Sequence, residues 1–256
     1  MKKIFVILLT FISVIMISGC RKTINNKYNT KVGTGYGITH SDNVGYAKVT
    51  VKNDVVDSVT FEEAFLPSDW GKVKTTEGMA PDDVLEYGTT TKSWGGKYLV
   101  IGNKRFTGTL RNEPLVVNGK TIASQAIKYT SEGINDLFAW LSESEANAKW
   151  YFENATTEKS FVATNEWQKH TYESAGRAGR TKTEANYWPG SESALGWKGN
   201  LDKLAEALKG TKMNQENQIS RDEDNVWKIG DVKTGATLTD LKDYYEIAKR
   251  GYNNAK

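Results

Sequence analysis

Cys20 is the only cysteine among the 256 residues of the chain. A single cysteine forms no disulfide within its own chain, so the fold has to be held together by an apolar core. The chain is long enough to build such a core in one large domain or in two small ones. The two histidines, His40 and His170, lie far apart in the sequence and show no spacing typical of a metal site.

The residues before Cys20 have the layout of a secretory signal. A short basic head, Met1-Lys2-Lys3, precedes a mostly apolar run over residues 4–17, and two small residues follow. The apolar run is shorter than the roughly 20 residues that a membrane-spanning helix needs. The pattern therefore predicts a signal peptide over residues 1–19.

Ile17-Ser18-Gly19-Cys20 resembles the lipobox of bacterial lipoproteins. The resemblance implies cleavage before Cys20, a thioether-linked diacylglycerol on its sulfur, and acyl chains such as palmitate that hold the protein in the bilayer. An uncleaved N-terminal anchor is the alternative. Both interpretations place the remaining chain on the extracytoplasmic face of the cell membrane. A lipid on Cys20 also leaves no thiol for a metal site or for thiol catalysis.

The net charge argues against one class of partner. It is formally +3, and the loss of Lys2 and Lys3 with the signal peptide leaves +1. A chain so close to neutrality gives no support for a nucleic-acid partner.

The first segment after the signal is polar and lacks periodicity. Residues 20–32 are therefore predicted to be a tether between the lipid and a domain over residues 33–256. The run Gly33-Thr34-Gly35-Tyr36-Gly37 does not fit the dinucleotide-binding fingerprint. It is predicted to be a flexible lead-in to the first strand.

Three β-hairpins are predicted from alternating or apolar runs on either side of a turn signal. The first and third share a Val-x-Val pattern, which leaves open a faint internal repeat or two ordinary hairpins. The predicted hairpins cover residues 44–61 around Asn53-Asp54, residues 98–107 around Gly102-Asn103, and residues 115–122 around Asn118-Gly119.

Apolar residues at helical spacing predict three helices. The first runs from Ile134 toward Trp150, the second covers Leu201–Leu208, and the third runs from about Leu238 to Arg250 and ends at Gly251. Residues 165–200, rich in small and polar residues, are predicted to be a long loop region. Hairpins followed by helices predict an α+β fold with an antiparallel sheet.

A motif stands directly before the last predicted helix. Asp231-Val232-Lys233-Thr234-Gly235-Ala236-Thr237 resembles the flavinylation motif of the FMN-binding domain family. That motif is Asp, two variable residues, Ser or Thr, and Gly-Ala-Thr. Members occur in Rnf and sodium-pumping NADH:quinone oxidoreductase complexes and in lipoproteins of extracellular electron transfer. The opening hairpin is also similar to the family's β-ribbon, whereas residues 67–200 resemble nothing in the family.

The resemblance implies an FMN-binding-domain-like fold and a covalent FMN. A flavin transferase would take FMN from FAD and join its phosphate to Thr237, with Asp231, Thr234, Gly235 and Ala236 as the surrounding recognition sequence. The implied function is electron transfer outside the cytoplasm. Electrons would come from a membrane dehydrogenase or quinol and pass to another carrier or a terminal acceptor. A carrier of this kind needs no catalytic residue of its own.

The residue types at the motif have a physical interpretation with and without a cofactor. Thr237 offers a hydroxyl nucleophile, and a helix beginning at Thr237 would direct free N–H groups toward a phosphate. Gly235 permits a tight turn before that helix. The run from Thr237 to Asp240 also fits a helix capping box, which explains Thr237 without a flavin. A plain cap leaves Asp231 and Thr234 unexplained.

Two alternative functions remain open. One is a surface lipoprotein that binds a small molecule or glycan through aromatic loops and carries no flavin. The other is a flavin-dependent reductase with a substrate of its own. Among the eight tryptophans, Trp188 lies in Tyr187-Trp188-Pro189-Gly190, a candidate edge facing the flavin. Arg177, Arg180 and Lys182 form a basic patch that is predicted to be solvated, with contact to anionic lipid or an acidic partner as the alternative.

Overall fold

The computed structural model describes residues 29–256, except 41, 71, 74–78, 91, 118, 123–124, 171–176 and 214–218. The predicted signal peptide, Cys20 and nearly all of the predicted tether lie outside the described residues. Within the described ranges, no helix has both the length and the apolar character needed to cross a membrane.

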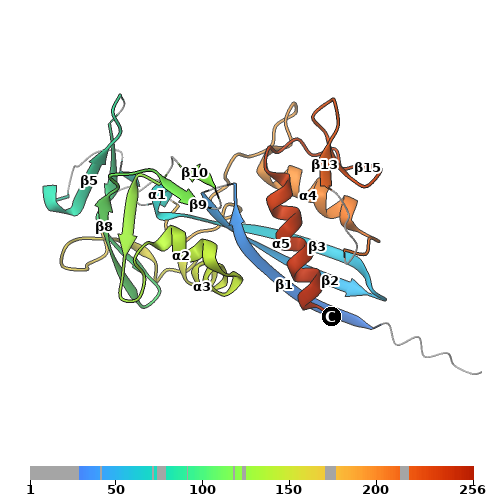
Figure 1. Cartoon of the computed structure of the whole chain (residues 1–256), viewed down its shortest axis with the longest axis horizontal. Coiled ribbons are helices and arrows are strands. Elements are labelled where there is room, and N and C mark those ends of the chain that lie inside the picture. The colour runs from blue at the N-terminus through green and yellow to red at the C-terminus, as the bar shows by residue number, and fades with distance from the viewer. Residues whose placement is uncertain are drawn as a thin grey trace, which may run out of the picture.

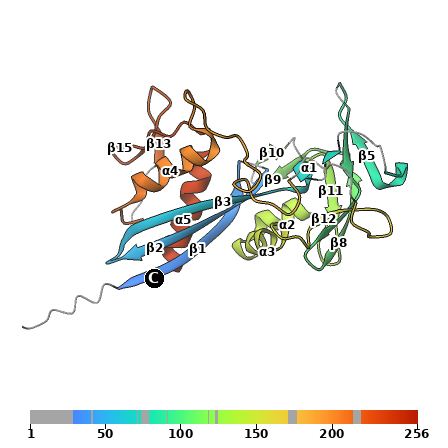
Figure 2. The same cartoon turned by 180° about the vertical axis from the view of Figure 1, so that it is seen from behind.

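The described residues form two lobes that lie side by side (Figure 1). The first lobe is built on an antiparallel sheet in the order β1-β2-β3, with helix α5 across one face. Figure 2 shows the opposite face of this sheet. The elements of the first lobe are β1 (Thr30–Thr39), β2 (Asn43–Lys52), β3 (Val55–Phe65), α4 (Gly196–Leu208), β13 (Ile219–Arg221), β14 (Trp227–Ile229), β15 (Val232–Lys233) and α5 (Leu241–Asn254).

The second lobe is inserted between β3 and α4, and corresponds to the middle region that resembles nothing in the family. Its sheets have the orders β4-β6-β5, β11-β8-β7-β12 and β10-β9, and every pairing is antiparallel. Its elements are α1 (Pro67–Trp70), β4 (Lys72–Val73), a 3₁₀ turn (Pro81–Asp83), β5 (Val84–Tyr87), β6 (Ser93–Gly96), β7 (Tyr98–Ile101), β8 (Lys104–Leu110), β9 (Leu115–Val117), β10 (Lys120–Ile122), β11 (Ile127–Thr130), α2 (Leu137–Glu143), α3 (Glu145–Ala155) and β12 (Phe161–Ala163).

The first sheet contributes to two apolar cores. On β2, Ala47 and Val49 pack in the core under α4 and α5, whereas Val44 packs in the core of the second lobe. Side chains alternate between the two faces of a strand, so one strand can serve both cores. The predicted α+β class with antiparallel sheets is confirmed.

The glycines of β1 lie against the backbone of α5. A Cβ atom on Gly35 would lie 2.0 Å from the carbonyl oxygen of Ile247, and one on Gly33 would lie 2.1 Å from that of Gly251. Gly251 belongs to α5, and a Cβ there would lie 2.9 Å from Val49. The absence of side chains on both elements lets their backbones touch.

Two sequence predictions fail at this contact. The glycine-rich run from Gly33 to Gly37 is part of β1 and is not a flexible lead-in, and the strand already begins at Thr30, inside the predicted tether. Gly251 does not end the last helix, which continues to Asn254. Both glycines are explained by the close approach of strand and helix.

The three predicted hairpins are confirmed as β2–β3, β7–β8 and β9–β10. Their turns have the conformation that the turn residues favour, since Asn53, Asp54, Gly102 and Gly119 all have positive φ angles. The predicted helix from Ile134 toward Trp150 is instead two helices. Ser144 is extended and caps α3 by accepting a hydrogen bond from the backbone N–H of Asn147 at 3.1 Å.

We predict that Gly35→Ala destabilises the protein by about 3 kcal/mol, because the new methyl group would displace the backbone of α5. Lys48→Ala is the matched control, since Lys48 is exposed on the neighbouring strand. Urea unfolding of both variants measures the difference. Equal unfolding free energies for the two variants would contradict the backbone contact.

Candidate functional site

The motif occupies the β14–β15 hairpin and the loop from β15 to α5. Asp231 lies in the hairpin turn beside Gly230, whose φ is +57°, and its side chain is exposed. Within the described part of the chain, the Asp231 carboxylate makes no hydrogen bond or ion pair. The structure therefore gives Asp231 no folding role through its charge.

Thr234 and Ala236 shape the loop from the inside. Both side chains are buried, and Ala236 packs in the core under α4 and α5. The backbone N–H of Thr234 donates to the carbonyl of Trp227 at 2.7 Å, and its hydroxyl accepts from the N–H of Ala236 at 3.0 Å. Gly235 lies between them with a φ of +73°, a left-handed conformation that glycine adopts without strain.

Thr237 is exposed, and its backbone is held by a side chain from α4. Buried Asn200 accepts hydrogen bonds through Oδ1 from the N–H groups of Thr237 at 2.7 Å and Leu238 at 3.0 Å. The Thr237 hydroxyl lies 3.5 Å from the same oxygen. Asn200 itself is fixed, because its Nδ2 donates to the carbonyl of Gly196 at 2.6 Å. No local pattern in the sequence marked Asn200 as a partner of a residue 37 positions away.

A cation lies beside the exposed threonine. The Arg221 guanidinium stacks over Trp227 at 4.7 Å, and its Nη2 lies 3.4 Å from the carbonyl oxygens of both Thr237 and Leu238. Among the described residues, Arg221 pairs with no carboxylate. The Lys203 side chain reaches within 3.8 Å of the place where a Cβ on Gly235 would lie.

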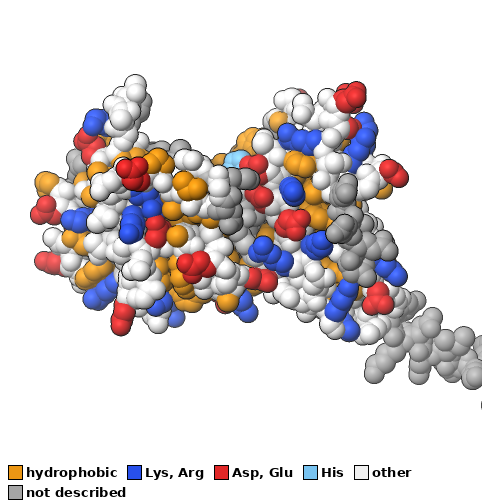
Figure 3. Space-filling model, viewed as in Figure 1, with side chains coloured by type: hydrophobic (Ala, Val, Ile, Leu, Met, Phe, Trp, Pro, Cys, Tyr) orange, Lys and Arg blue, Asp and Glu red, His pale blue; other side chains and the backbone are white. Residues whose placement is uncertain are grey.

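The surface around this site carries both signs of charge. Figure 3 shows basic side chains gathered near the end of the first lobe that holds β13 and β15, with acidic ones beside them. Lys233 pairs with Asp222 at 2.8 Å, and Lys228 lies 3.8 Å from the same carboxylate. These lysines are therefore partly neutralised, whereas Arg221 keeps its charge available for an anion.

Helix α5 begins later than predicted. Its first residue is Leu241 and its N-cap is Asp240, whose side chain makes no capping hydrogen bond. The backbone groups of Leu238 make hydrogen bonds outside the helix. Its N–H donates to Asn200 Oδ1, and its carbonyl accepts from Trp227 Nε1 at 2.6 Å. Thr237 is thus not at the helix start, and both the predicted phosphate site on that N-terminus and the alternative capping box are wrong.

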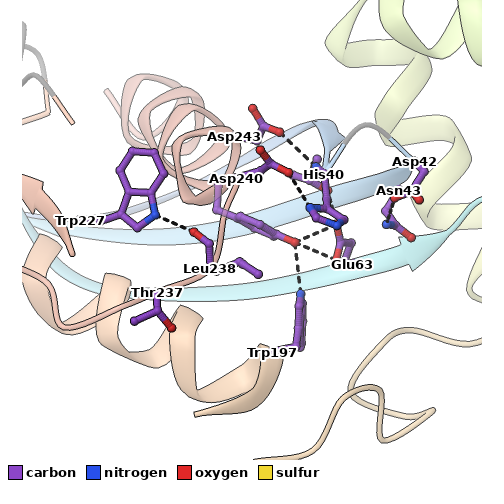
Figure 4. A network of polar contacts seen from close by, with 12 residues as sticks. His40, Asp42, Asn43, Glu63, Trp197, Trp227, Thr237, Leu238, Asp240 and Asp243 are labelled. Atoms are coloured by element: carbon purple, nitrogen blue, oxygen red, sulfur yellow. Dashed lines mark hydrogen bonds and ion pairs between the residues drawn. The ribbon is translucent and has the colours of Figure 1, made fainter. Parts of the chain in front are cut away.

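The start of α5 is tied to the turn between β1 and β2 (Figure 4). The backbone N–H of His40 donates to Asp243 at 3.0 Å, and His40 Nδ1 lies 2.6 Å from Asp240 Oδ2. The described residues contain no group of three side chains able to hold a metal ion. Through its contacts with Asp240 and Asp243, His40 anchors the start of α5.

A buried polar network lies under the same part of the fold. The carboxylate of Glu63 on β3 lies 2.5 Å from the ammonium of Lys182, and both side chains are buried. Glu63 also accepts hydrogen bonds from the hydroxyls of Thr39 and Tyr244, the latter at 2.9 Å. Tyr244 in turn accepts from Trp197 Nε1 at 3.2 Å (Figure 4).

The basic patch predicted on the loop is therefore wrong for Lys182, which is enclosed by aromatic rings and lies 4.5 Å above that of Tyr187. Arg177 is also engaged, since it pairs with Asp69 at 3.2 Å. Sequence reasoning missed this because a buried lysine requires a carboxylate partner that lies more than a hundred residues away.

Two ionisable groups near the network have shifted pKa values. Burial, followed by the charge of Glu63, raises the pKa of Tyr244 well above its usual value, so the phenol stays protonated as a donor. Burial, and then repulsion from Asp69, raises the pKa of Asp42 from 3.8 to about 6. Asp42 nevertheless accepts a hydrogen bond from the side chain of Asn43 at 2.6 Å.

The two aromatic residues of the candidate flavin-facing edge differ in their exposure to solvent. Tyr187 is half-buried between the two cores, whereas Trp188 is 45 % exposed. Trp197 and Trp227 are buried. The aromatic residue left for a ligand in this segment is therefore Trp188.

A cavity of about 380 Å³ lies between the lobes, away from the motif. Its lining is apolar at Ile38, Phe138 and Leu141, and polar at Asp243 and Arg250. Its volume falls in the range typical of small-molecule pockets.

Comparison with known proteins gave no relative: no family model, no curated protein and no solved structure matches the chain.

We predict that removal of either member of the buried ion pair is more damaging than removal of both. Glu63→Gln and Lys182→Met should each cost about 3–5 kcal/mol, because each leaves an uncompensated buried charge, and the double variant should cost less than either single variant. Urea unfolding of the four proteins measures the coupling. Additive losses would show that the two side chains act independently.

We predict that Asn200→Ala loosens the Thr237 loop, because two backbone N–H groups lose their acceptor. Amide hydrogen exchange of Thr237 and Leu238 should accelerate at least about tenfold, the ratio equivalent to one hydrogen bond. Asn154→Ala is the control, since Asn154 Nδ2 makes the same bond to the carbonyl four residues before it at 2.7 Å but lies on α3 in the second lobe. Unchanged exchange in Asn200→Ala would refute this positioning role.

Proposed function

We propose that the protein is an extracytoplasmic electron-transfer flavolipoprotein that carries FMN as a phosphoester on Thr237. The observation that carries this proposal is the presentation of Thr237, whose side chain is exposed while Asn200 fixes its backbone. A transferase has to reach the hydroxyl, and a fixed loop offers the hydroxyl in one position.

The residues around Thr237 suit the phosphate end of FMN. In the transfer, a bond would form between Thr237 Oγ1 and the FMN phosphorus of FAD. The pyrophosphate bond would break, AMP would leave, and a base of the transferase would take the hydroxyl proton. Arg221 then provides positive charge beside the new phosphodiester. The bound flavin would supply the redox chemistry, while this chain sets its position and exposure.

The division into lobes supports an FMN-binding-domain-like assignment of the first lobe. That lobe contains both segments that carry the resemblance, the hairpin β2–β3 and the motif before α5. The chain also offers a reason for anchoring. Two acyl chains on Cys20 would hold the protein stably in the membrane, and the short segment after them would keep the flavin close to a membrane dehydrogenase or quinol.

We predict that the full chain co-expressed with a flavin transferase gains about 438 Da, which is one FMN less water, and that Thr237→Ala does not. Thr237→Ser keeps the hydroxyl and should retain part of the modification. Thr239→Ala, which removes an exposed threonine two residues further on, should be modified as fully as wild type. Intact mass spectrometry measures the mass of all four proteins and so shows which of them carry FMN.

An unmodified wild-type chain, folded and in the presence of an active transferase, would reject the flavin. The inter-lobe cavity would then favour the second candidate, a surface lipoprotein that binds a small molecule or glycan. A flavinylated protein that turns over one specific acceptor, with no exchange with other carriers, would instead favour a reductase.

A further inference from the structure

Trp188 is a large aromatic side chain that the fold holds outside both cores. The residue is 45 % exposed, and nearby Leu195 is 38 % exposed. The backbone of Trp188 has a φ of +41°, which is unusual for a residue with a bulky side chain. A strained, exposed tryptophan is a feature that folding by itself does not favour.

The Trp188 backbone is fixed against the beginning of α4. Its carbonyl oxygen accepts a hydrogen bond from the N–H of Trp197 at 3.0 Å. The same oxygen would lie 2.6 Å from a Cβ on Gly196, so the close approach requires glycine at the first position of the helix. The loop therefore holds the indole at a defined place beside α4.

The same end of α4 holds Thr237. The Asn200 side chain folds back onto the carbonyl of Gly196 and accepts the N–H of Thr237. The carbonyl of Trp188 accepts a hydrogen bond from α4 at Trp197. The N–H of Thr237 donates a hydrogen bond to α4 at Asn200, three residues further along. Three residues span about 4.5 Å of helix axis, so the loops that carry Trp188 and Thr237 are attached to α4 within one turn of each other.

The charge beside Thr237 orients a ligand such as FMN. Arg221 attracts the phosphate end and has no carboxylate partner among the described residues. The apolar surface of Trp188 and Leu195 suits the opposite, aromatic end. Charge complementarity at one end and exposed apolar area at the other thus fit a single amphipathic occupant.

We propose that the indole of Trp188 is the platform on which the isoalloxazine ring of the FMN carried by Thr237 stacks, with Leu195 beside it. This inference rests on the proposed flavinylation of Thr237. Aromatic rings in offset or edge contact attract each other beyond the area that they bury. The stack would shield one face of the flavin from water and leave the other face free for an electron partner.

The test measures flavin fluorescence per bound FMN in the full chain co-expressed with a flavin transferase. An indole in contact with a flavin quenches its emission by electron transfer. Trp188→Ala should therefore raise the fluorescence about threefold or more, because an aromatic contact that favours the stacked, quenched state at least about twofold leaves at most about a third of the flavin emitting. Trp188→Phe keeps a ring without an indole, so it should raise the emission while retaining more of the flavin's resistance to collisional quenching by iodide.

Trp167→Ala is the matched control. Trp167 is also a partly exposed loop tryptophan with a positive φ, +65°, but it lies in the second lobe against Tyr98 and Arg105. Its replacement should leave the flavin emission unchanged. Intact mass gives the FMN occupancy of every variant and separates the possible failures.

Wild type and Trp188→Ala with equal FMN occupancy and equal fluorescence would overturn the stacking and leave the flavinylation of Thr237 standing. An equal rise in Trp167→Ala would also overturn it, because the effect would then not be specific to Trp188. A wild-type chain that gains no FMN mass would overturn both proposals.

Discussion

The contact on which the rest of the first lobe depends is the one between the backbones of β1 and α5. Gly33, Gly35 and Gly251 allow strand and helix to touch without intervening side chains. Because α5 directly follows the motif loop, its position on the sheet fixes where that loop returns to the core. His40 then fixes the start of α5 through Asp240 and Asp243, so the loop with Thr237 is bounded by rigid structure at its C-terminal end.

The buried ion pair joins the two segments of chain that connect the inserted second lobe to the first lobe. Lys182 lies on the segment that returns from the second lobe to α4, and Glu63 lies on the last strand before the chain leaves the first lobe. A buried charge is tolerated only when it is paired and hydrogen-bonded, and Glu63 has Lys182, Thr39 and Tyr244 as partners. The ion pair thus favours one alignment of the segment that carries Lys182 along β3, which carries Glu63.

The sequence predicted what depends on local chemistry and missed what depends on distant partners. Turn residues such as Asn53-Asp54 set a hairpin by their own conformational preferences, so the hairpins could be predicted. Gly35 and Asn200 act through contacts with Ile247 and Thr237, which no local pattern reveals. The same reason explains the wrong prediction of where α5 begins. The backbone N–H of Leu238 donates to Asn200 and its carbonyl accepts from Trp227, so the residues after Thr237 do not form the first turn of the helix.

The motif itself separates into residues that the fold requires and residues that it does not. Thr234 and Ala236 are buried, and their replacement would disturb the loop. Thr237 is held through its backbone N–H, a contact that any residue except proline could make, and its hydroxyl has only a 3.5 Å contact with Asn200. Folding therefore explains the shape of the loop but not the choice of a threonine at its exposed position, and the proposed flavinylation of its hydroxyl would give a reason for that choice.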